Sequence, residues 1–187
     1  MKEMVMSEKE ILTACSKIGA SLTSSLKDED KLPLFVCVMK GAMEFMVDLL
    51  KHVDVPLLVD YIQLQSYSGT HSTGEVSLLK DISTNVDGRT VVIVEDVVDT
   101  GLSMNFLLDH LKKIGNPKRV IVCALFDKKC ARKVQTQVDY VGMSLTENKF
   151  LLGYGLDYNG LKRNVPYVYI PTSEEVGEMD EILKKRG

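Results

Sequence analysis

The chain has 187 residues with a formal net charge of −3, and hydrophobic residues make up 45% of it. This length suits one domain with a substantial core, and no apolar stretch approaches the roughly 18 residues of a membrane span. The acidic balance argues against a dedicated nucleic-acid or anionic-membrane binder, which usually carries a basic excess. The charged N-terminus differs from a secretory signal, so we expect a cytoplasmic protein that forms a single domain over residues 1–187.

The first half of the chain alternates helical and strand-like patterns. Residues 7–10 form a capping box, and apolar residues then follow helical spacing from Ile11 through Leu12 to Leu26. Residues 34–39 are a continuous apolar run typical of a central parallel strand, 42–52 indicate a helix, and 56–64 indicate a second strand. Residues 65–75 are polar and lack periodicity, as lid loops do, and 76–79 are predicted to return as the other arm of a hairpin.

The second half repeats the alternation. The patterns predict strands over 90–94, 119–126, 138–141 and 167–170, and helices over 102–114 and 173–185. Gly115 ends the first of these helices, with Pro117 beyond it. Strands that alternate with helices predict a parallel α/β sheet, and such sheets bind ligands at the carboxyl ends of their strands.

One loop carries the strongest chemical signal. Glu95 and Asp96 directly follow the strand over 90–94, and Asp99-Thr100-Gly101 precede the next helix. Free backbone N–H groups at a helix start attract phosphate, while paired carboxylates can hold a ribose diol directly or through Mg²⁺. The loop therefore predicts a site for a phosphorylated sugar. An ordinary turn with solvated or helix-capping acids would leave the clustering of three acids unexplained.

Other site types are not indicated. The four cysteines form no C-x-x-C pair and there are only three histidines, so the sequence gives no zinc signature. Neither the Gly-rich dinucleotide motif nor the P-loop motif occurs after any predicted strand.

Residues Val91–Ser103, VVIVEDVVDTGLS, closely resemble the phosphoribosyl-diphosphate-binding motif of the type I phosphoribosyltransferases. The resemblance implies a parallel-sheet α/β core with helices on both faces. It also implies a small hood subdomain formed by parts of the N-terminal and C-terminal segments.

Further matches narrow the resemblance to the 6-oxopurine branch, the hypoxanthine-guanine phosphoribosyltransferases, over roughly residues 34–170. The block 149–158, KFLLGYGLDY, is the most specific to this branch. The other matching pieces are Met39-Lys40-Gly41, Ser66-Tyr67, Lys128 and Arg163.

The resemblance assigns five residues to pyrophosphate: Lys40, Gly41, Ser66, Tyr67 and Arg163. Backbone amides around Lys40 would bind the anion, and the Ser66-Tyr67 loop would cover it and exclude water. Arg163 would contact it with its planar fork of donors. A non-proline cis peptide is expected at Met39–Lys40. The competing interpretation of Lys40 is a surface lysine at the sheet edge.

The resemblance places the phosphoribosyl group in the acidic loop. Glu95 and Asp96 would hold the ribose hydroxyls together with Mg²⁺, and Asp99 would act as the general base near N7 of the purine. Alternatively, Asp99 caps the following helix, a role compatible with accepting a proton. Four residues would wrap the 5′-phosphate at the helix start: Thr100, Gly101, Leu102 and Ser103. Some relatives carry lysine at the position of Leu102, a change that backbone binding tolerates.

The resemblance assigns the purine to Lys128, Phe150, Leu151 and Asp157. Lys128 would donate to O6, which favours a 6-oxopurine over adenine because an ammonium has only donors. Its competing interpretation is membership of a solvated set with Lys129, Arg132 and Lys133. Phe150 would stack on the base, or instead be a buried core aromatic. Leu151 would meet the base through its backbone, and Asp157 would lie near a 2-amino group and hold a second Mg²⁺ through water.

The implied activity joins hypoxanthine or guanine to 5-phosphoribosyl 1-diphosphate, giving IMP or GMP and pyrophosphate. The expected partners are these small molecules, with no nucleic acid and no membrane, and the expected assembly is a homodimer or homotetramer. One alternative is a xanthine-preferring enzyme. Another is an RNA-binding attenuation regulator of the same fold, which would need a basic face that this sequence does not indicate.

Overall fold

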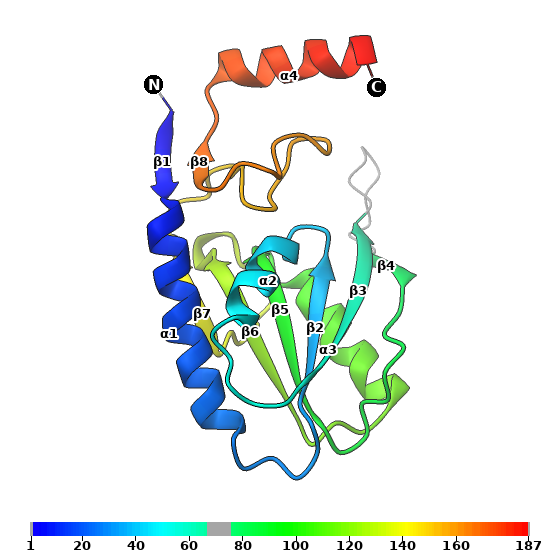
Figure 1. Cartoon of the computed structure of the whole chain (residues 1–187). Helices are drawn as coiled ribbons and strands as arrows, with labels where there is room; N and C mark the ends of the chain where they lie inside the picture. Colours follow the sequence, from blue (N-terminus) through cyan, green and yellow to red (C-terminus); the bar gives the residue numbers. More distant parts are fainter. Residues whose placement is uncertain (1, 67–75, 187) are drawn as a thin grey trace.

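The computed structural model describes residues 2–66 and 76–186. Its centre is a six-stranded sheet in the order β4-β3-β2-β5-β6-β7, parallel except that β4 runs antiparallel to β3 (Figure 1). The strands are β1 Glu3–Met6, β2 Leu34–Met39, β3 Leu58–Ser66, β4 Val76–Lys80, β5 Thr90–Val98, β6 Arg119–Asp127, β7 Tyr140–Ser144 and β8 Val168–Ile170. The helices are α1 Glu8–Leu26, α2 Met43–Leu50, α3 Leu102–Ile114 and α4 Ser173–Arg186, with a 3₁₀ turn η1 at Lys129–Ala131.

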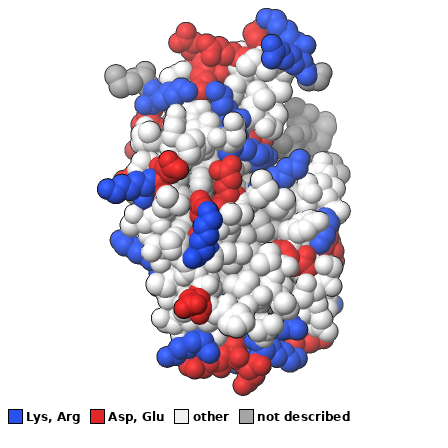
Figure 2. All heavy atoms as spheres, viewed as in Figure 1, with Lys and Arg blue, Asp and Glu red and all other residues white. Residues whose placement is uncertain are grey.

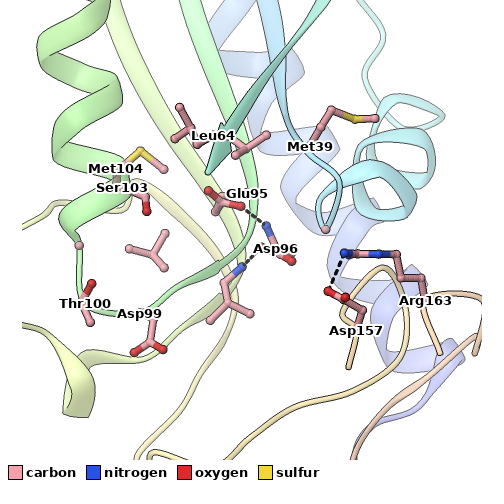
Figure 3. A pocket seen from close by; sticks show the side chains of 15 residues that line it. Met39, Leu64, Glu95, Asp96, Asp99, Thr100, Ser103, Met104, Asp157 and Arg163 are labelled. Carbon is pink, nitrogen blue, oxygen red and sulfur yellow. Dashed lines mark hydrogen bonds and ion pairs between the residues drawn. The ribbon is translucent and has the colours of Figure 1, made fainter. Parts of the chain in front are cut away.

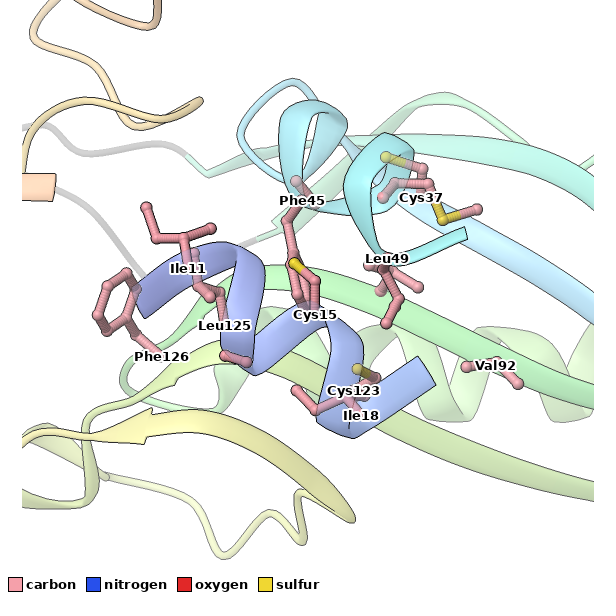
Figure 4. Close-up of a cluster of buried hydrophobic side chains, with 14 of the residues drawn as sticks. Ile11, Cys15, Ile18, Cys37, Phe45, Leu49, Val92, Cys123, Leu125 and Phe126 are labelled. Carbon is pink, nitrogen blue, oxygen red and sulfur yellow. The ribbon is translucent and has the colours of Figure 1, made fainter. Parts of the chain in front are cut away.

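Two apolar clusters hold helices to opposite faces of the sheet, as expected for this fold. Alternate residues of a strand point to opposite faces, so neighbours on β5 enter different clusters. The cluster under α1 and α2 (Figure 4) includes Ile11, Cys15, Phe45, Val92 and Cys123. The cluster under α3 includes Leu34, Val36, Val91, Ile93 and Leu107. Each fully buried large aliphatic or aromatic side chain contributes about 1.5–3 kcal/mol to folding.

Helix α1 begins as its capping box predicts. The Ser7 hydroxyl accepts from the Glu10 backbone N–H at 3.4 Å, and the Glu10 carboxylate accepts from the Ser7 N–H at 2.8 Å. Most of the helically spaced apolar residues are buried, but Leu12 is exposed, because its position falls on the outer side of the helix.

Several element bounds differ from those predicted. Strand β3 starts at Leu58, two residues beyond Pro56, and β7 starts at Tyr140, where pairing with Cys123 of β6 begins. Gln65 and Ser66 belong to β3, whereas the rest of the predicted loop, residues 67–75, lies outside the described residues. The Met39–Lys40 peptide is cis, as expected.

A second, two-stranded sheet lies above the carboxyl ends of the central strands (Figure 1). It pairs β1 with β8 antiparallel, and α4 follows β8. The buried Glu175 carboxylate of α4 fastens these pieces together, because it accepts from Lys2 Nζ and from the Tyr169 hydroxyl at 2.8 Å each. Strand β1 was not predicted, since four residues before a capping box carry little periodicity. None of the helices in the described ranges has the length and apolar character to span a membrane.

Candidate active site

A cavity of about 280 Å³ opens at the carboxyl ends of β2 and β5. Figure 3 shows the side chains that line it. Nine of the predicted site residues line it: Gly41, Glu95, Asp96, Asp99, Thr100, Gly101, Ser103, Asp157 and Arg163. Apolar side chains complete the wall, among them Met39 and two that the sequence analysis did not single out, Leu64 and Met104. Apolar residues look the same in sequence whether they face a core or a cavity, so no signal marked these two.

The two acids at the sheet edge lie within strand β5, not after it. Strand β5 continues to Val98, since its pairing with β6 extends to Val98 opposite Asp127. The predicted end at Val94 was therefore wrong. Glu95 is buried, and this burial, followed by the charge of the adjacent Asp96, raises the pKa of the Glu95 carboxyl. A cation or a diol donating hydrogen bonds would relieve the repulsion between the two carboxylates.

Gly41 leaves space for the Asp96 carboxylate. A Cβ at Gly41 would overlap that carboxylate, so any larger residue would displace Asp96 or the chain around the cis peptide. Lys40 itself is exposed and does not line the cavity. The cavity thus meets this loop through the glycine backbone rather than through the lysine side chain.

The start of α3 is open to an anion. Its N-cap, Gly101, has φ +85° and supplies no side chain, and no side-chain cap bond forms there. The nearest substitute is a long contact of 3.4 Å from the Leu102 N–H to the Thr100 hydroxyl. The first amides of α3 therefore keep donor capacity, together with the positive end of the helix dipole. The Leu102 side chain is exposed, outside the cavity lining.

Asp99 carries a carboxylate oxygen that is free to accept. Its Oδ1 is buried and has no hydrogen-bond partner among the described residues, while Oδ2 lies 4.0 Å from Lys128 Nζ. Because the α3 N-cap is Gly101 and lacks a side-chain bond, Asp99 does not cap that helix. The capping interpretation therefore fails, and proton acceptance stays a prediction.

Lys128 is buried at the end of β6, only 7% exposed. Its Nζ donates to the carbonyl of Lys149 at 2.7 Å, and its backbone N–H donates to the Val98 carbonyl at 3.0 Å. The solvated-set interpretation is wrong for this residue, although Lys129 and Lys133 are exposed.

The segment 149–158 descends from the upper sheet to the cavity. Phe150 is 51% exposed, so the interpretation as a buried core aromatic is wrong, and its ring meets Tyr158 edge-on at 6.1 Å. Leu151 is buried. The Tyr154 hydroxyl donates to Asp48 Oδ2 of α2 at 2.7 Å, an anchor that the sequence analysis missed.

Gly155 brings this segment against the loop at Gly41. It has φ +87°, and a Cβ there would overlap the Gly41 carbonyl oxygen. Its own carbonyl accepts from Arg163 Nη1 at 2.5 Å, and Arg163 Nη2 pairs with Asp157 Oδ1 at 2.6 Å (Figure 3). Residues from two distant parts of the chain thus enclose one side of the cavity, and Arg163 is part of its lining. Of the predicted Ser66-Tyr67 pair, Tyr67 lies outside the described residues.

Comparison with known proteins agrees with this arrangement. A family model described as a phosphoribosyl transferase domain matches residues 4–159. A hypoxanthine-guanine phosphoribosyltransferase of Streptococcus thermophilus is 39% identical over 175 residues, 93% of this chain and 95% of the relative. A hypoxanthine-guanine-xanthine phosphoribosyltransferase of Tritrichomonas foetus is 40% identical over 171 residues, 91% of each chain.

The fold leads to the same group. The crystal structure of a hypoxanthine phosphoribosyltransferase from Staphylococcus aureus matches with a TM-score of 0.85 at 34% identity, covering 92% of both chains. The chain therefore belongs to the phosphoribosyltransferase family, in the branch whose members are named hypoxanthine-guanine phosphoribosyltransferases.

Proposed function

We propose that this protein transfers the 5-phosphoribosyl group of 5-phosphoribosyl 1-diphosphate to N9 of hypoxanthine or guanine. The main support is that three features meet at the carboxyl ends of the central strands. They are the paired Glu95 and Asp96, the uncapped start of α3, and a buried lysine beside Asp99. The bond between ribose C1 and pyrophosphate breaks as N9 bonds to C1. The products are IMP or GMP and pyrophosphate.

Different groups of the cavity bind the two ends of 5-phosphoribosyl 1-diphosphate. Glu95 and Asp96 hold the ribose hydroxyls, and the amides at the start of α3 bind the 5′-phosphate. Asp99, whose Oδ1 has no hydrogen-bond partner in the described part of the chain, accepts the N7 proton as the base gains the ribosyl group. At the other end, Arg163 and the Gly41 backbone stabilise the charge that grows on departing pyrophosphate.

Lys128 selects the purine through its hydrogen-bonding direction. Burial and the bond to the Lys149 carbonyl fix its ammonium, leaving two N–H donors for the ligand. These donors suit the O6 acceptor of hypoxanthine and guanine and cannot satisfy the 6-amino group of adenine. Phe150, which is exposed beside this lysine's partner carbonyl, stacks on the purine face.

Mg²⁺ fits the donors present. No group of three or more acidic, histidine or cysteine side chains in the described ranges forms a complete metal site. Glu95 and Asp96 supply two carboxylates, and Mg²⁺ commonly takes one or two carboxylates with waters and substrate phosphates. When bound, the ion would neutralise charge on the diphosphate. Asp157 is a candidate for holding a second ion through water, once Arg163 turns from it to pyrophosphate.

The activity assay distinguishes two alternatives, a xanthine-using enzyme and an RNA-binding regulator. Xanthine is tested as a substrate because the Tritrichomonas relative is named for it. We favour guanine, since the acidic Asp157 suits a 2-amino group better than a 2-oxo group. The RNA-binding regulator is less favoured, because Figure 2 shows acidic and basic side chains interspersed on the face drawn, without the continuous basic stripe that RNA phosphates require.

We further propose a homodimer or homotetramer that uses the α2 side of the β3–β4 edge. Val59 and Tyr61 pair in register with Phe35 and Cys37, which pack under α1 and α2, yet both are about half exposed. Leu79 of β4 is 57% exposed. An uncovered apolar patch of this kind usually marks a protein contact, and light scattering of the purified protein measures the assembly.

We also propose a cytoplasmic location and a single domain over residues 1–187. All four cysteines are free, as is usual for proteins in a reducing compartment. Gly155 packs closely on Gly41, which joins the segment 149–158 to the central sheet and supports a single domain.

Incubation with 5-phosphoribosyl 1-diphosphate, Mg²⁺ and hypoxanthine or guanine tests the proposed reaction. Chromatography should detect IMP or GMP, and Asp96→Asn is the matched variant expected to lose most of the product. Absence of both nucleotides with the folded wild-type protein would contradict the proposal, and leader-RNA binding would then be measured.

A further inference from the structure

The loop that lines the phosphate end of the cavity is held from behind by one arginine. Arg132 Nε donates to the Asp99 carbonyl at 3.0 Å, and Nη2 donates to the Val98 carbonyl at 3.3 Å. Nη1 donates to the Thr136 carbonyl at 2.8 Å, and Nη2 also pairs with the Asp127 carboxylate. The Arg132 side chain is only 14% exposed, and its guanidinium donates to protein groups rather than to solvent.

The residues after Arg132 continue the same support. The backbone N–H groups of Lys133 and Val134 both donate to the Thr100 carbonyl, at 2.9 Å and 3.1 Å. A Cβ at Gly101 would overlap atoms of Val134 and Thr136 and would lie 3.0 Å from Arg132 Cδ. The outer surface of the loop is therefore in close contact with residues 132–136 over its whole length.

This contact fixes the direction of the loop's amides. In a planar trans peptide the C=O and N–H groups point in opposite directions. Carbonyls of Val98, Asp99 and Thr100 that are held on the Arg132 side therefore turn the N–H groups of the next residues to the other side, toward the cavity. A phosphate needs those N–H groups to converge.

We propose that Arg132 is a positioning residue for the reaction, an inference that rests on the proposed function. It orients the amides that receive the 5′-phosphate and holds Asp99 in place for the purine proton, without touching substrate itself. Asp127, 2% exposed, holds the guanidinium in turn. Because Asp127 ends β6 and Lys128 follows it directly, the Arg132–Asp127 pair connects the loop that would bind phosphate to the lysine that would recognise the purine.

The substitution Arg132→Lys tests the positioning role with little expected loss of stability. Lysine keeps a positive charge beside the buried Asp127, but a single ammonium cannot reproduce a fork that spans several separate acceptors. The matched control is Arg119→Lys at the opposite end of β6. Arg119 likewise pairs with a buried carboxylate, Glu29, at 2.8 Å, and donates to the Ser25 carbonyl at 2.8 Å, far from the cavity along the strand.

Two readouts are needed, steady-state kinetics and calorimetric binding of ribose 5-phosphate and of pyrophosphate. Arg132→Lys should raise the KM for 5-phosphoribosyl 1-diphosphate and the Kd for ribose 5-phosphate by about tenfold or more, since small misplacements of positioned groups cost this much. The Kd for pyrophosphate, which binds at the other end of the cavity, should stay within about twofold, as for a distant independent site. Millimolar guanidinium should partly restore ribose 5-phosphate binding to Arg132→Ala and should leave the near-wild-type binding of Arg119→Ala unchanged.

Two outcomes separate the positioning role of Arg132 from the proposed function, and a third bears on both. Unchanged KM and Kd in Arg132→Lys, or uniform losses that match those of Arg119→Lys, would overturn the positioning role while leaving the proposed function intact. If the wild type binds ribose 5-phosphate without turning over any purine, the proposed function fails, and the binding measurement still decides the role of Arg132. Failure of the wild type to bind ribose 5-phosphate would overturn both.

Discussion

Replacing the buried Lys128 gives a quantitative test of the proposed base recognition. Lys128→Met keeps an unbranched side chain of similar length and removes every donor. A hydrogen bond from a charged group contributes about 1.5–3 kcal/mol net, and tenfold in rate corresponds to about 1.4 kcal/mol. The loss of one such bond to O6 should therefore lower kcat/KM for hypoxanthine by about 10- to 150-fold.

The same substitution has a cost in stability that must be measured beside it. The part-buried Lys149 carbonyl loses its donor at 2.7 Å, and a fully buried group left unsatisfied would cost about 1–3 kcal/mol, which sets the upper bound. For a chain of this size each kcal/mol lowers Tm by about 2–4 °C. Assays well below the variant's Tm keep folding and recognition apart.

Initial rates with hypoxanthine and guanine, and calorimetric affinity for 5-phosphoribosyl 1-diphosphate, complete the test. Lys129→Met is the matched control, because Lys129 is adjacent and exposed and should behave as wild type. The recognition argument would be refuted if Lys128→Met kept kcat/KM for hypoxanthine within about twofold, below the loss of even one ordinary hydrogen bond. Equal losses in phosphoribosyl-diphosphate affinity would instead indicate a scaffold role.

Further substitutions test the acids and the enclosing segment. Asp99→Asn should lower kcat by about 10²–10⁴-fold, as loss of a general base does, while calorimetric binding of IMP stays near wild type; unaltered kcat would dismiss the base. Burial raises the pKa of the Glu95 carboxyl, so the folded protein keeps the carboxyl proton at pH values where the unfolded chain has lost it. The free energy of unfolding therefore falls as pH rises from the unfolded-state pKa toward the raised pKa. Glu95→Gln should therefore raise Tm more at pH 8 than at pH 4 and weaken 5-phosphoribosyl 1-diphosphate binding; an equal Tm shift at both pH values would count against this. A Cβ in Gly155→Ala would overlap the Gly41 carbonyl and force the two segments apart, and Arg163 would move with the Gly155 carbonyl to which it donates. The Kd for pyrophosphate should therefore rise, whereas an unchanged Kd would mean that the packing is not needed for the site.

Local signals predicted most of the core fold. The capping box located the start of α1, and continuous apolar runs located β2 and β6, because both depend on residues near one another in sequence. The end of β5 could not be read in this way. Glu95 and Asp96 look like loop residues, but pairing with β6 keeps them in the strand as far as Val98.

The candidate site was predictable where a local motif marks it, and not where it depends on contacts between segments that are distant in sequence. Asp99 and Lys128 belong to recognisable motifs, whereas Arg132 looked like one more surface charge in a basic run. Its role depends on backbone carbonyls more than 30 residues away, which only the folded chain brings within reach. The contact of Gly155 with Gly41 is of the same kind, since no local pattern records it.

The most direct test of the account is the initial rate of pyrophosphate release from 5-phosphoribosyl 1-diphosphate and Mg²⁺ with hypoxanthine, guanine, xanthine and adenine side by side. The account predicts turnover with hypoxanthine and guanine, little with xanthine, and none with adenine. Turnover with adenine, or no turnover with any of the four bases, would contradict it.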